Sequence, residues 1–345
     1  MLDFNPHTRP YPCIPPIWKL VKTGKTYQVF EHKDSKDVIL YADDRVHISD
    51  EISPTIIPDK GRVITSMSRL WFNLTEDIVP NAVVEHAASD FAHIGEASRC
   101  IKMKKLYMLP IRAIVYGYAT EKLWDSYRNG NHEFYDNSLP SNLPEPTKFY
   151  DNSLPSNLPE PTKFYANSLP DDLPESAELP HPIFMPTTKA PSGQPDEILS
   201  FEAMIHTIRS YNGFPTEDLP VHLCNWVYEN SAQLCKQIRD YSLELYSFAH
   251  AYALKRGLIL AKTKFEFGLD DNCNLLLGDS CLTPDTSLYW SRNSHVAGRP
   301  QPNFHNQFIQ DYLKGHPCAT DLPNDIIQQT RKRYRECFDL LKKEL

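Results

Sequence analysis

Apolar and polar residues alternate over short stretches in about the first 120 positions of the chain. Runs rich in β-branched and aromatic residues occur at TYQVF (26–30), DVILYA (37–42) and RAIVYGYA (112–119), and such runs are typical of strands with one buried face. Between the second and third runs, RVITSMSRLWFNLTE (62–76) has the apolar spacing of an amphipathic helix. This part of the chain therefore predicts an α+β lobe.

The second half of the chain predicts a long helix followed by a hairpin. Apolar residues recur at steps of four and three between residues 231 and 256, just before Gly257, which is the pattern of one helix face ending at a glycine. The next segment, LILAKTKFEFGLDDNCNLLLGDS (258–280), predicts two strands joined by a turn at residues 270–272. A last helix is expected from about residue 324 to the end at residue 345.

The middle of the chain contains a tandem repeat. FYDNSLPSNLPEPTK occupies 134–148, recurs unchanged at 149–163 and then decays over 164–178. Repeats so rich in Pro, Asn and Ser carry too few apolar groups to offset the entropy lost on ordering the backbone. We therefore interpret 134–178 as an exposed, extended or disordered loop that grew by duplication; a proline-motif docking site is the functional alternative.

Composition excludes several classes of protein. The chain has 36 Lys and Arg against 44 Asp and Glu, a formal charge of -8, so a dominant nucleic-acid surface is not expected. No run reaches the 18 or so apolar residues that a membrane helix needs, and the first residues lack a signal-peptide core, so we expect a cytoplasmic protein. The eight cysteines form no C-x-x-C pair, and free, mostly buried thiols are expected.

The segment KTKFEFG (262–268) carries the most informative side chains. Alternation along a strand places Lys262, Lys264 and Glu266 on one face and the two phenylalanines on the other. Such a lysine can neutralise phosphate oxygens, and the glutamate can bind Mg²⁺, with Asp279 on the partner strand as a second carboxylate. The simpler interpretation is a solvated strand face with an ion pair, and the pattern alone favours it.

Two further segments are weaker candidates. In KTGKTYQVFEH (22–32), Gly24 lets backbone amides approach an anion and Lys25 adds charge, although the segment lacks a full P-loop pattern. The loop FMPTTKAPSGQPDE (184–197) offers Lys189, Asp196 and Glu197.

Taken together, these segments resemble the SAICAR synthetase family. The resemblance runs in order along nearly the whole chain, and its most specific blocks are TKFEFG (263–268) and LTPDTS (282–287). It implies an α+β fold related to the ATP-grasp enzymes, with a nucleotide-binding lobe at 1–110, a second lobe at 111–345 and ATP between them. It also implies a carbon–nitrogen ligase that forms ADP and phosphate: ATP phosphorylates a carboxylate, and an amine then displaces phosphate from the acyl phosphate.

Matching the family's motifs position by position implies roles for individual residues on the nucleotide side. Lys264, Glu266 and Asp279 are the implied catalytic residues, with Glu266 and Asp279 as the magnesium ligands. ATP is expected to contact Gly24, Lys25, Met108, Lys189 and Lys264. Lys60-Gly61, Thr188, Asp196 and Glu197 also match the family pattern.

The substrate side departs from the family pattern. The chain has His47 for a serine, Tyr116 and Leu288 for arginines, Glu121-Lys122 for Gly-Ser, and Asn306 and Gln310 for basic residues. Each charge-assisted contact to an anion is worth on the order of 1.5–3 kcal/mol, so these losses argue against a ribose phosphate. They favour a ligase that joins a small (di)carboxylic acid to an amino acid or amine in specialised metabolism. Its candidate substrate residues are Arg45, His47, Arg112, Tyr116, Lys122 and Leu288.

Two alternatives stay open. One is a genuine SAICAR synthetase of purine biosynthesis. The other is a nucleotide-binding pseudoenzyme, which is favoured by Lys262 and Ser280 at positions where the family has acidic residues. The expected cofactors are ATP and Mg²⁺. The expected partners are a small carboxylic acid and an amino acid or amine, with neither nucleic acid nor membrane; a homo-oligomer is allowed.

Overall fold

The computed structural model describes residues 18–24, 26–48, 51–85, 88–91, 96–130, 133–134, 167–190, 194–211, 213–214, 217–218 and 220–344. The chain forms two compact units. Unit 1 comprises Met1–Met108, Phe248–Ser294 and Pro302–Leu345, and unit 2 comprises Leu109–Ser247 and His295–Gln301. The predicted boundary at residue 110 lies beside the first of these divisions. The predicted continuous lobe at 111–345 differs, because the chain returns to unit 1 after Ser247.

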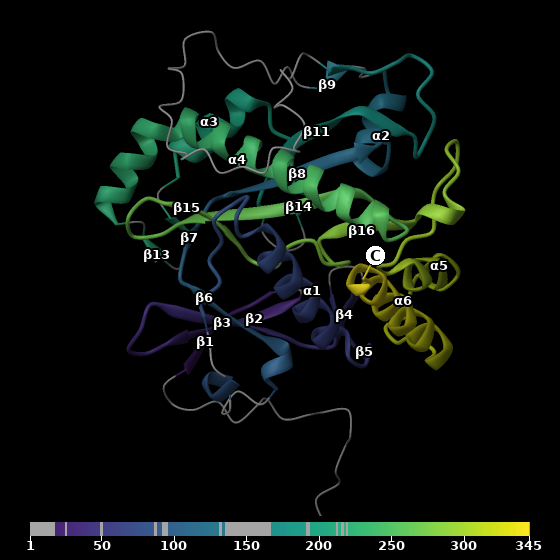
Figure 1. Ribbon diagram of the computed structural model, residues 1–345, viewed down its shortest axis with the longest axis horizontal. Helices are drawn as coiled ribbons and strands as arrows, with labels where there is room; N and C mark the ends of the chain where they lie inside the picture. Colours follow the sequence, from purple (N-terminus) through teal and green to yellow (C-terminus); the bar gives the residue numbers. More distant parts are fainter. Residues whose placement is uncertain are drawn as a thin grey trace, which may run out of the picture. The chain divides into compact units, whose positions relative to one another are not determined.

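Unit 1 opens with an antiparallel sheet in the order β1-β2-β3-β6 (Figure 1). Its strands are β1 (Trp18–Thr23), β2 (Tyr27–His32), β3 (Asp37–Ala42) and β6 (Cys100–Lys104). Their alternation buries one face, where Phe30, Ile39 and Cys100 pack with Phe91. A separate hairpin joins β4 (Arg45–Ile48) to β5 (Glu51–Ile56).

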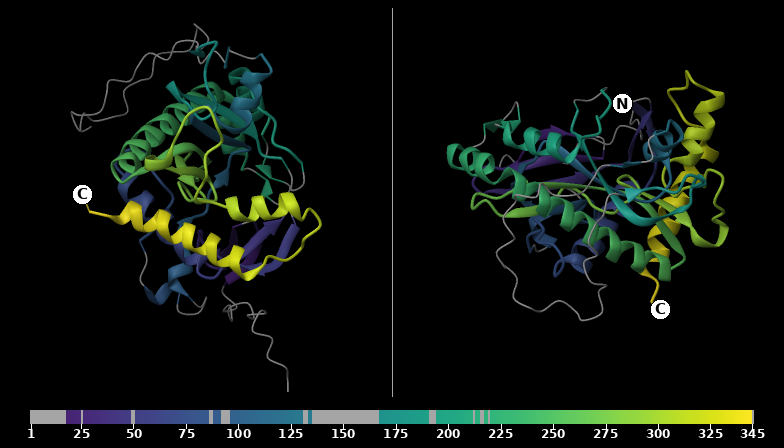
Figure 2. Two further views of the ribbon diagram at one scale, coloured as in Figure 1. Left: turned by 90° about the vertical axis from the view of Figure 1, so that its right-hand side faces the viewer. Right: turned by 90° about the horizontal axis from the view of Figure 1, so that it is seen from above.

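Helices cover unit 1. The first, α1 (Lys60–Thr75), buries the apolar stripe that includes Val63, Met67 and Trp71, because residues three and four apart share a helix face. It contacts β3, β6 and the C-terminal helix α6 (Asn324–Lys342). Figure 2 shows α5 (Gln307–Gly315) next to α6.

A long strand, β14 (Leu258–Leu269), organises the remainder of unit 1. Within unit 1 it pairs antiparallel with β15 (Leu275–Gly278), β16 (Ser287–Ser291) and β7 (Tyr107–Met108). Gly257 precedes β14 with φ +81°, a left-handed conformation that glycine adopts without strain. The predicted hairpin at 258–280 is confirmed.

Unit 2 is built on the antiparallel pair β8 (Ile111–Tyr118) and β11 (Glu178–Thr188). The helix α2 (Glu121–Arg128) contributes Leu123 and Tyr127 to a buried apolar cluster on this pair. A methyl group at Gly117 would lie 1.7 Å from the hydroxyl of Tyr246, so β8 requires glycine there.

The remaining elements are short, apart from α4. Unit 2 also contains α3 (Phe201–Arg209), and the division at Ser247 falls within α4 (Val221–Lys255). The short strands are β9 (Glu133–Phe134) with β10 (Asn167–Ser168), and β12 (Gly213–Phe214) with β13 (Glu217–Asp218). The 3₁₀ turns are Ala88–Phe91, Ala97–Arg99 and Arg292–Ser294.

The α+β class predicted from the sequence is confirmed, and other expectations can be compared directly. The helix expected at 231–256 begins earlier, at Val221. Most of the predicted repeat loop, residues 135–166, lies outside the described residues. Within the described part of the chain, no helix is long and apolar enough to span a bilayer. The described cysteines are free thiols, and the buried ones are Cys100, Cys235, Cys281 and Cys337.

Candidate functional site

Glu266 and Asp279 are neighbours across the β14–β15 hairpin. Glu266 pairs with Gly278 in the ladder, and Asp279 follows Gly278 directly. Glu266 is only 5% exposed. Asp279 adopts φ +56°, and its Oδ1 accepts a hydrogen bond of 2.7 Å from the backbone N–H of Ser280. Because few non-glycine residues adopt a positive φ, Asp279 has a special backbone conformation directly after the end of β15.

Lys264 shares its strand face with Glu266. Its Nζ lies 3.4 Å from Glu266 Oε1, and its side chain is 28% exposed. Phe265 and Phe267 are buried. The alternation predicted from the sequence is therefore present, and the lysine retains the access to solvent that a phosphate ligand requires.

The donor set at this hairpin fits magnesium. Mg²⁺ is usually bound through one or two carboxylates together with waters and substrate phosphates, and this hairpin offers two, Glu266 and the residue after its ladder partner, Asp279. Among the described residues, no three His, Cys, Asp or Glu side chains form a metal-binding group. A metal at this hairpin would therefore take most of its ligands from water and nucleotide.

Met108 lies over the hairpin that carries the two carboxylates. It pairs with Gly268 in the β7–β14 ladder. A methyl group at Gly268 or Gly278 would approach Met108 Sδ to 3.1 or 3.0 Å, which is tighter than ordinary van der Waals contact. The glycine that ends TKFEFG therefore makes room for the residue predicted to lie at the adenine-side linker.

The turn between β1 and β2 is the predicted phosphate turn. The backbone N–H of Gly24 donates to the carbonyl of Tyr27 at 2.8 Å and closes it. Lys25 lies outside the described residues. The side chain of Thr26 leaves the turn and donates to Asp285 Oδ2 at 2.9 Å.

Asp285, in the LTPDTS block, is the centre of a buried ionic cluster. It lies 2.7 Å from Lys60 Nζ and 3.6 Å from His305 Nε2, and it accepts a 2.6 Å hydrogen bond from the hydroxyl of Tyr334. Burial alone would raise the pKa of Asp285, but the charge of Lys60, the neighbouring His305 and the hydrogen bonds lower it below its usual value. Sequence reasoning gave Asp285 no role.

A second carboxylate, Asp44, explains why glycine follows Lys60. Asp44 Oδ1 accepts from the backbone N–H of Gly61 at 2.9 Å, and its two oxygens accept from Arg99 at 2.5 and 2.9 Å. A methyl group at Gly61 would lie 2.3 Å from the carbonyl oxygen of Ala42. The Lys60-Gly61 match therefore marks the start of α1, where Lys60 pairs with Asp285, Gly61 donates to Asp44, and the Ala42 carbonyl leaves no room for a side chain at Gly61.

The two cations predicted to bind substrate in unit 2 meet at one residue. The Arg112 guanidinium forms an ion pair with the Asp196 carboxylate, and Lys122 Nζ donates to the Asp196 carbonyl at 3.0 Å. The other Asp196 oxygen accepts from the backbone N–H of Ala190 at 3.0 Å. Lys189 is adjacent in the chain, and its backbone N–H donates to Pro110. Asp196 thus connects Ala190, Arg112 and Lys122 within the described residues of unit 2.

The other predicted substrate residues lie elsewhere. Tyr116 is fully buried in the apolar cluster of unit 2, and burial raises the pKa of its hydroxyl. Arg45 Nε pairs with Asp43 Oδ2 at 2.5 Å. Leu288 is half-buried on β16, opposite Lys262. His47 belongs to β4, and its side chain is outside the described set.

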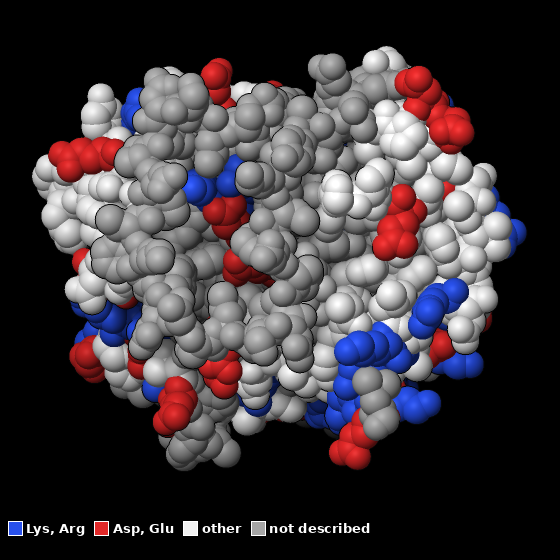
Figure 3. All heavy atoms as spheres, turned by 45° about the horizontal axis from the view of Figure 1, so that its top comes forward, with Lys and Arg blue, Asp and Glu red and all other residues white. Residues whose placement is uncertain are grey.

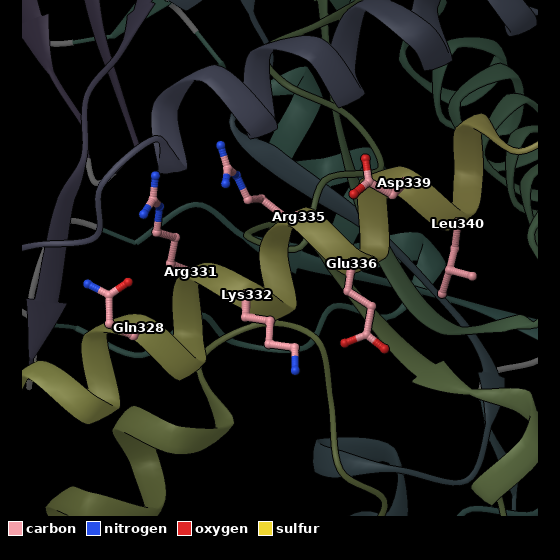
Figure 4. Close-up of a pocket in the computed structure, with 7 residues that line it drawn as sticks. All are labelled: Gln328, Arg331, Lys332, Arg335, Glu336, Asp339 and Leu340. Atoms are coloured by element: carbon pink, nitrogen blue, oxygen red, sulfur yellow. The ribbon is translucent and has the colours of Figure 1, made fainter.

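An open groove of about 640 Å³ runs along α6. Arg331 and Arg335 project from one side of this helix, and Lys332 and Glu336 from the other (Figure 4). Both arginines form ion pairs with Asp59, the residue before α1. These ion pairs attach α6 to the start of α1, and none of the residues predicted for the site lines the groove, so we place the candidate site at β14 and β15.

Charge on the surface is mixed. Figure 3 shows separate groups of basic and acidic side chains on the face that it draws. Lys36 and Asp271, for example, form an exposed ion pair at 2.6 Å.

Comparisons with known proteins agree on one family. The sequence profile of the SAICAR synthetase family matches residues 20–323. A phosphoribosylaminoimidazole-succinocarboxamide synthase of Lachnospira eligens is 34% identical over 328 residues, covering 94% of this chain and 95% of that protein. The enzyme of the same name from Pichia angusta is 31% identical over 341 residues, with 94% and 95% coverage.

The fold leads to the same family. A SAICAR synthase from Saccharomyces cerevisiae, solved in complex with SAICAR, matches with a TM-score of 0.69. The match is 27% identical and covers 94% of this chain and 95% of that chain.

These relatives overturn two predictions from the sequence. A ligase of specialised metabolism is wrong as the main interpretation, and so is the small carboxylic acid predicted as its partner. Enzymes that match the chain over 94% of its length carry the name of the purine-pathway enzyme instead. The prediction assumed that a site loses its positive charge when the family's basic residues are replaced. That assumption fails because Lys and Arg at other positions can supply the charge.

The family assignment itself rests on three independent agreements. The profile covers most of the chain, relatives above 30% identity align along 94% of it, and the fold matches that of a solved family member. The chain therefore belongs to the SAICAR synthetase family and is a carbon–nitrogen ligase that uses ATP and forms ADP and phosphate.

Proposed function

We propose that the chain is a phosphoribosylaminoimidazole-succinocarboxamide synthase, which joins aspartate to carboxylated aminoimidazole ribotide. The observation that carries the proposal is the 34% identity, along 94% of the chain, to an enzyme with that name. The reaction forms an amide from a carboxylate and an amine, and ATP supplies the driving force. This is the purine-biosynthesis alternative that the sequence left open.

The chemistry divides into two steps. A carboxylate oxygen of the ribotide attacks the γ-phosphorus of ATP, which forms an acyl phosphate and releases ADP. The amine of aspartate, after losing a proton, then attacks the acyl carbon, and phosphate leaves with the bonding electrons. Activation is needed because a carboxylate is a poor electrophile until one of its oxygens can depart as phosphate.

We assign the nucleotide side to the hairpin of unit 1. Lys264, beside Glu266 at 3.4 Å, would neutralise charge on the transferred phosphoryl group. Glu266 and Asp279 would hold Mg²⁺, which when bound neutralises phosphate charge. Gly24 and Met108 would border the nucleotide, as the family resemblance implies. A relation to the ATP-grasp enzymes is part of the same proposal.

On the substrate side, Arg112 and Lys122 are the most suitable cations. Both converge on Asp196, and both reactants of the proposed reaction carry carboxylates. A guanidinium binds such a group through paired hydrogen bonds. We therefore propose that these two side chains bind carboxylate groups, whereas Lys189 is assigned to ATP, as the family resemblance implies.

The test is a product assay with the full chain. ATP, Mg²⁺, aspartate and the carboxylated ribotide are incubated with the enzyme, and amide product and ADP are measured by mass spectrometry. We expect equal amounts of the two, and loss of both when any reactant is omitted. Nucleotide binding without ADP release would contradict the proposal and favour the pseudoenzyme, and ADP release without amide product would also contradict it.

A further inference from the structure

Asp285 joins three distant segments of unit 1 through its two carboxylate oxygens. Oδ2 accepts from Thr26 at 2.9 Å and lies 2.7 Å from Lys60 Nζ. Oδ1 accepts from the Tyr334 hydroxyl at 2.6 Å. The three partners stand in the β1–β2 turn, at the first residue of α1 and in α6. One buried carboxylate therefore fixes a turn relative to two helices.

The turn depends on this contact more than the helices do. Both helices have extensive apolar packing. In addition, Asp59, the residue before α1, forms ion pairs with Arg331 and Arg335 of α6. The turn contains Gly24, whose conformational freedom would otherwise be large, and one backbone hydrogen bond from Gly24 to Tyr27 closes it. The side chain of Thr26 supplies a second, charge-assisted attachment.

The Thr26 bond is strong for physical reasons. Asp285 and Lys60 are each only 8% exposed, so water competes little for the carboxylate. Lys60 and His305 also keep Asp285 ionised by lowering its pKa. A hydroxyl that donates to a buried, charged oxygen contributes more than a neutral hydrogen bond does.

We propose that Asp285 is a positioning residue for the nucleotide, acting through Thr26 to hold the β1–β2 turn against the start of α1. This inference rests on the proposed function in so far as that turn borders bound ATP. Asp285 itself is surrounded by protein groups, so it acts on the nucleotide through the turn and not by direct contact. Thr26 is thereby held in place before ATP arrives, which reduces the entropy lost on binding.

Two matched variants test the inference in the full chain. Thr26→Val and Tyr334→Phe each remove one hydroxyl from the same carboxylate. We expect both to lower the melting temperature. Only Thr26→Val should raise KM for ATP, by about tenfold with kcat changed less than about twofold, because only Thr26 attaches the turn. Thr26→Ser, which restores the hydroxyl, should recover most of the wild-type KM.

Other outcomes distinguish failure of the positioning role from failure of the proposed function. Equal increases in KM for the two variants, or an unchanged KM in Thr26→Val with a lowered melting temperature, would show that Asp285 is purely structural and would overturn the inference. ADP affinity, measured by calorimetry, gives the same comparison without turnover. Absence of turnover in the wild type, together with weaker ADP binding in Thr26→Val alone, would reject the proposed function and support the positioning role.

Discussion

Replacing Glu266 with glutamine is expected to reduce kcat/KM of the ligase reaction by about a thousandfold, or about 4 kcal/mol in transition-state stabilisation. The change keeps the shape of the side chain but removes the negative charge that, with Asp279, would hold Mg²⁺. It also removes the charged partner 3.4 Å from Lys264. The measurement is steady-state ADP formation over a range of Mg²⁺ concentrations, where the variant should need more Mg²⁺ for half-maximal rate.

The matched control is Glu76→Gln, which removes a carboxylate from an exposed position after α1. This variant should keep wild-type rates and the wild-type dependence on Mg²⁺. A Glu266→Gln enzyme that retained more than about a tenth of wild-type kcat/KM would be inconsistent with a metal-binding role for Glu266.

Replacing Asp285 with alanine is expected to lower the free energy of unfolding by about 3–5 kcal/mol, because Lys60 would remain buried without its counter-charge. Both side chains of this pair are 8% exposed. The measurement is urea denaturation followed by tryptophan fluorescence. As a control, Lys36→Ala removes an ion pair whose lysine is 79% exposed, and its midpoint should stay close to that of the wild type.

Two further comparisons identify the cause. Adding Lys60→Met to Asp285→Ala should recover much of the lost stability, because both buried charges are then absent. The pKa of Asp285 is lower in the folded state, so its contribution is complete above the unfolded value, about 3.9, and is lost as pH falls through the folded pKa. The double variant should lack that component of acid sensitivity; equal acid sensitivity would contradict this assignment.

The hairpin of unit 1 could be predicted from sequence because its information is local. Alternation along residues 262–268 fixed the shared face of Lys264 and Glu266, and Asp270-Asp271-Asn272 marked the turn. The structure has both features. Strand alternation needs only neighbouring residues, and the apolar stripe of α1 was predicted from its spacing for the same reason.

The Asp285 cluster could not be predicted in this way. Its members are far apart in sequence, with Thr26 and Asp285 separated by 259 positions, and no periodicity records such a contact. Lys60 and Asp285 would each be expected at the surface, because isolated charges are rarely buried. Only the fold brings them together and offsets the cost of their desolvation.

The substrate prediction failed because it considered only the positions where the family has basic residues. It did not consider basic residues that the fold brings together from other positions. Tyr116, the replacement for an arginine, is buried in an apolar cluster, whereas Arg112 and Lys122 converge on Asp196. Basic side chains at other positions of unit 2 therefore lie near Asp196, although position 116 no longer has an arginine. The sequence pattern could indicate each residue as a candidate. Their proximity could not be predicted, because it depends on the pairing of β8 with β11.

The most direct test of carboxylate activation by ATP is an isotope-transfer measurement. The carboxylated ribotide is prepared with ¹⁸O in its carboxylate and incubated with the full chain, ATP, Mg²⁺ and aspartate. We expect one ¹⁸O in each phosphate released, because the carboxylate oxygen that attacks phosphorus leaves with it. Unlabelled phosphate accompanying amide formation would show that water cleaved ATP and would contradict the proposed acyl-phosphate chemistry.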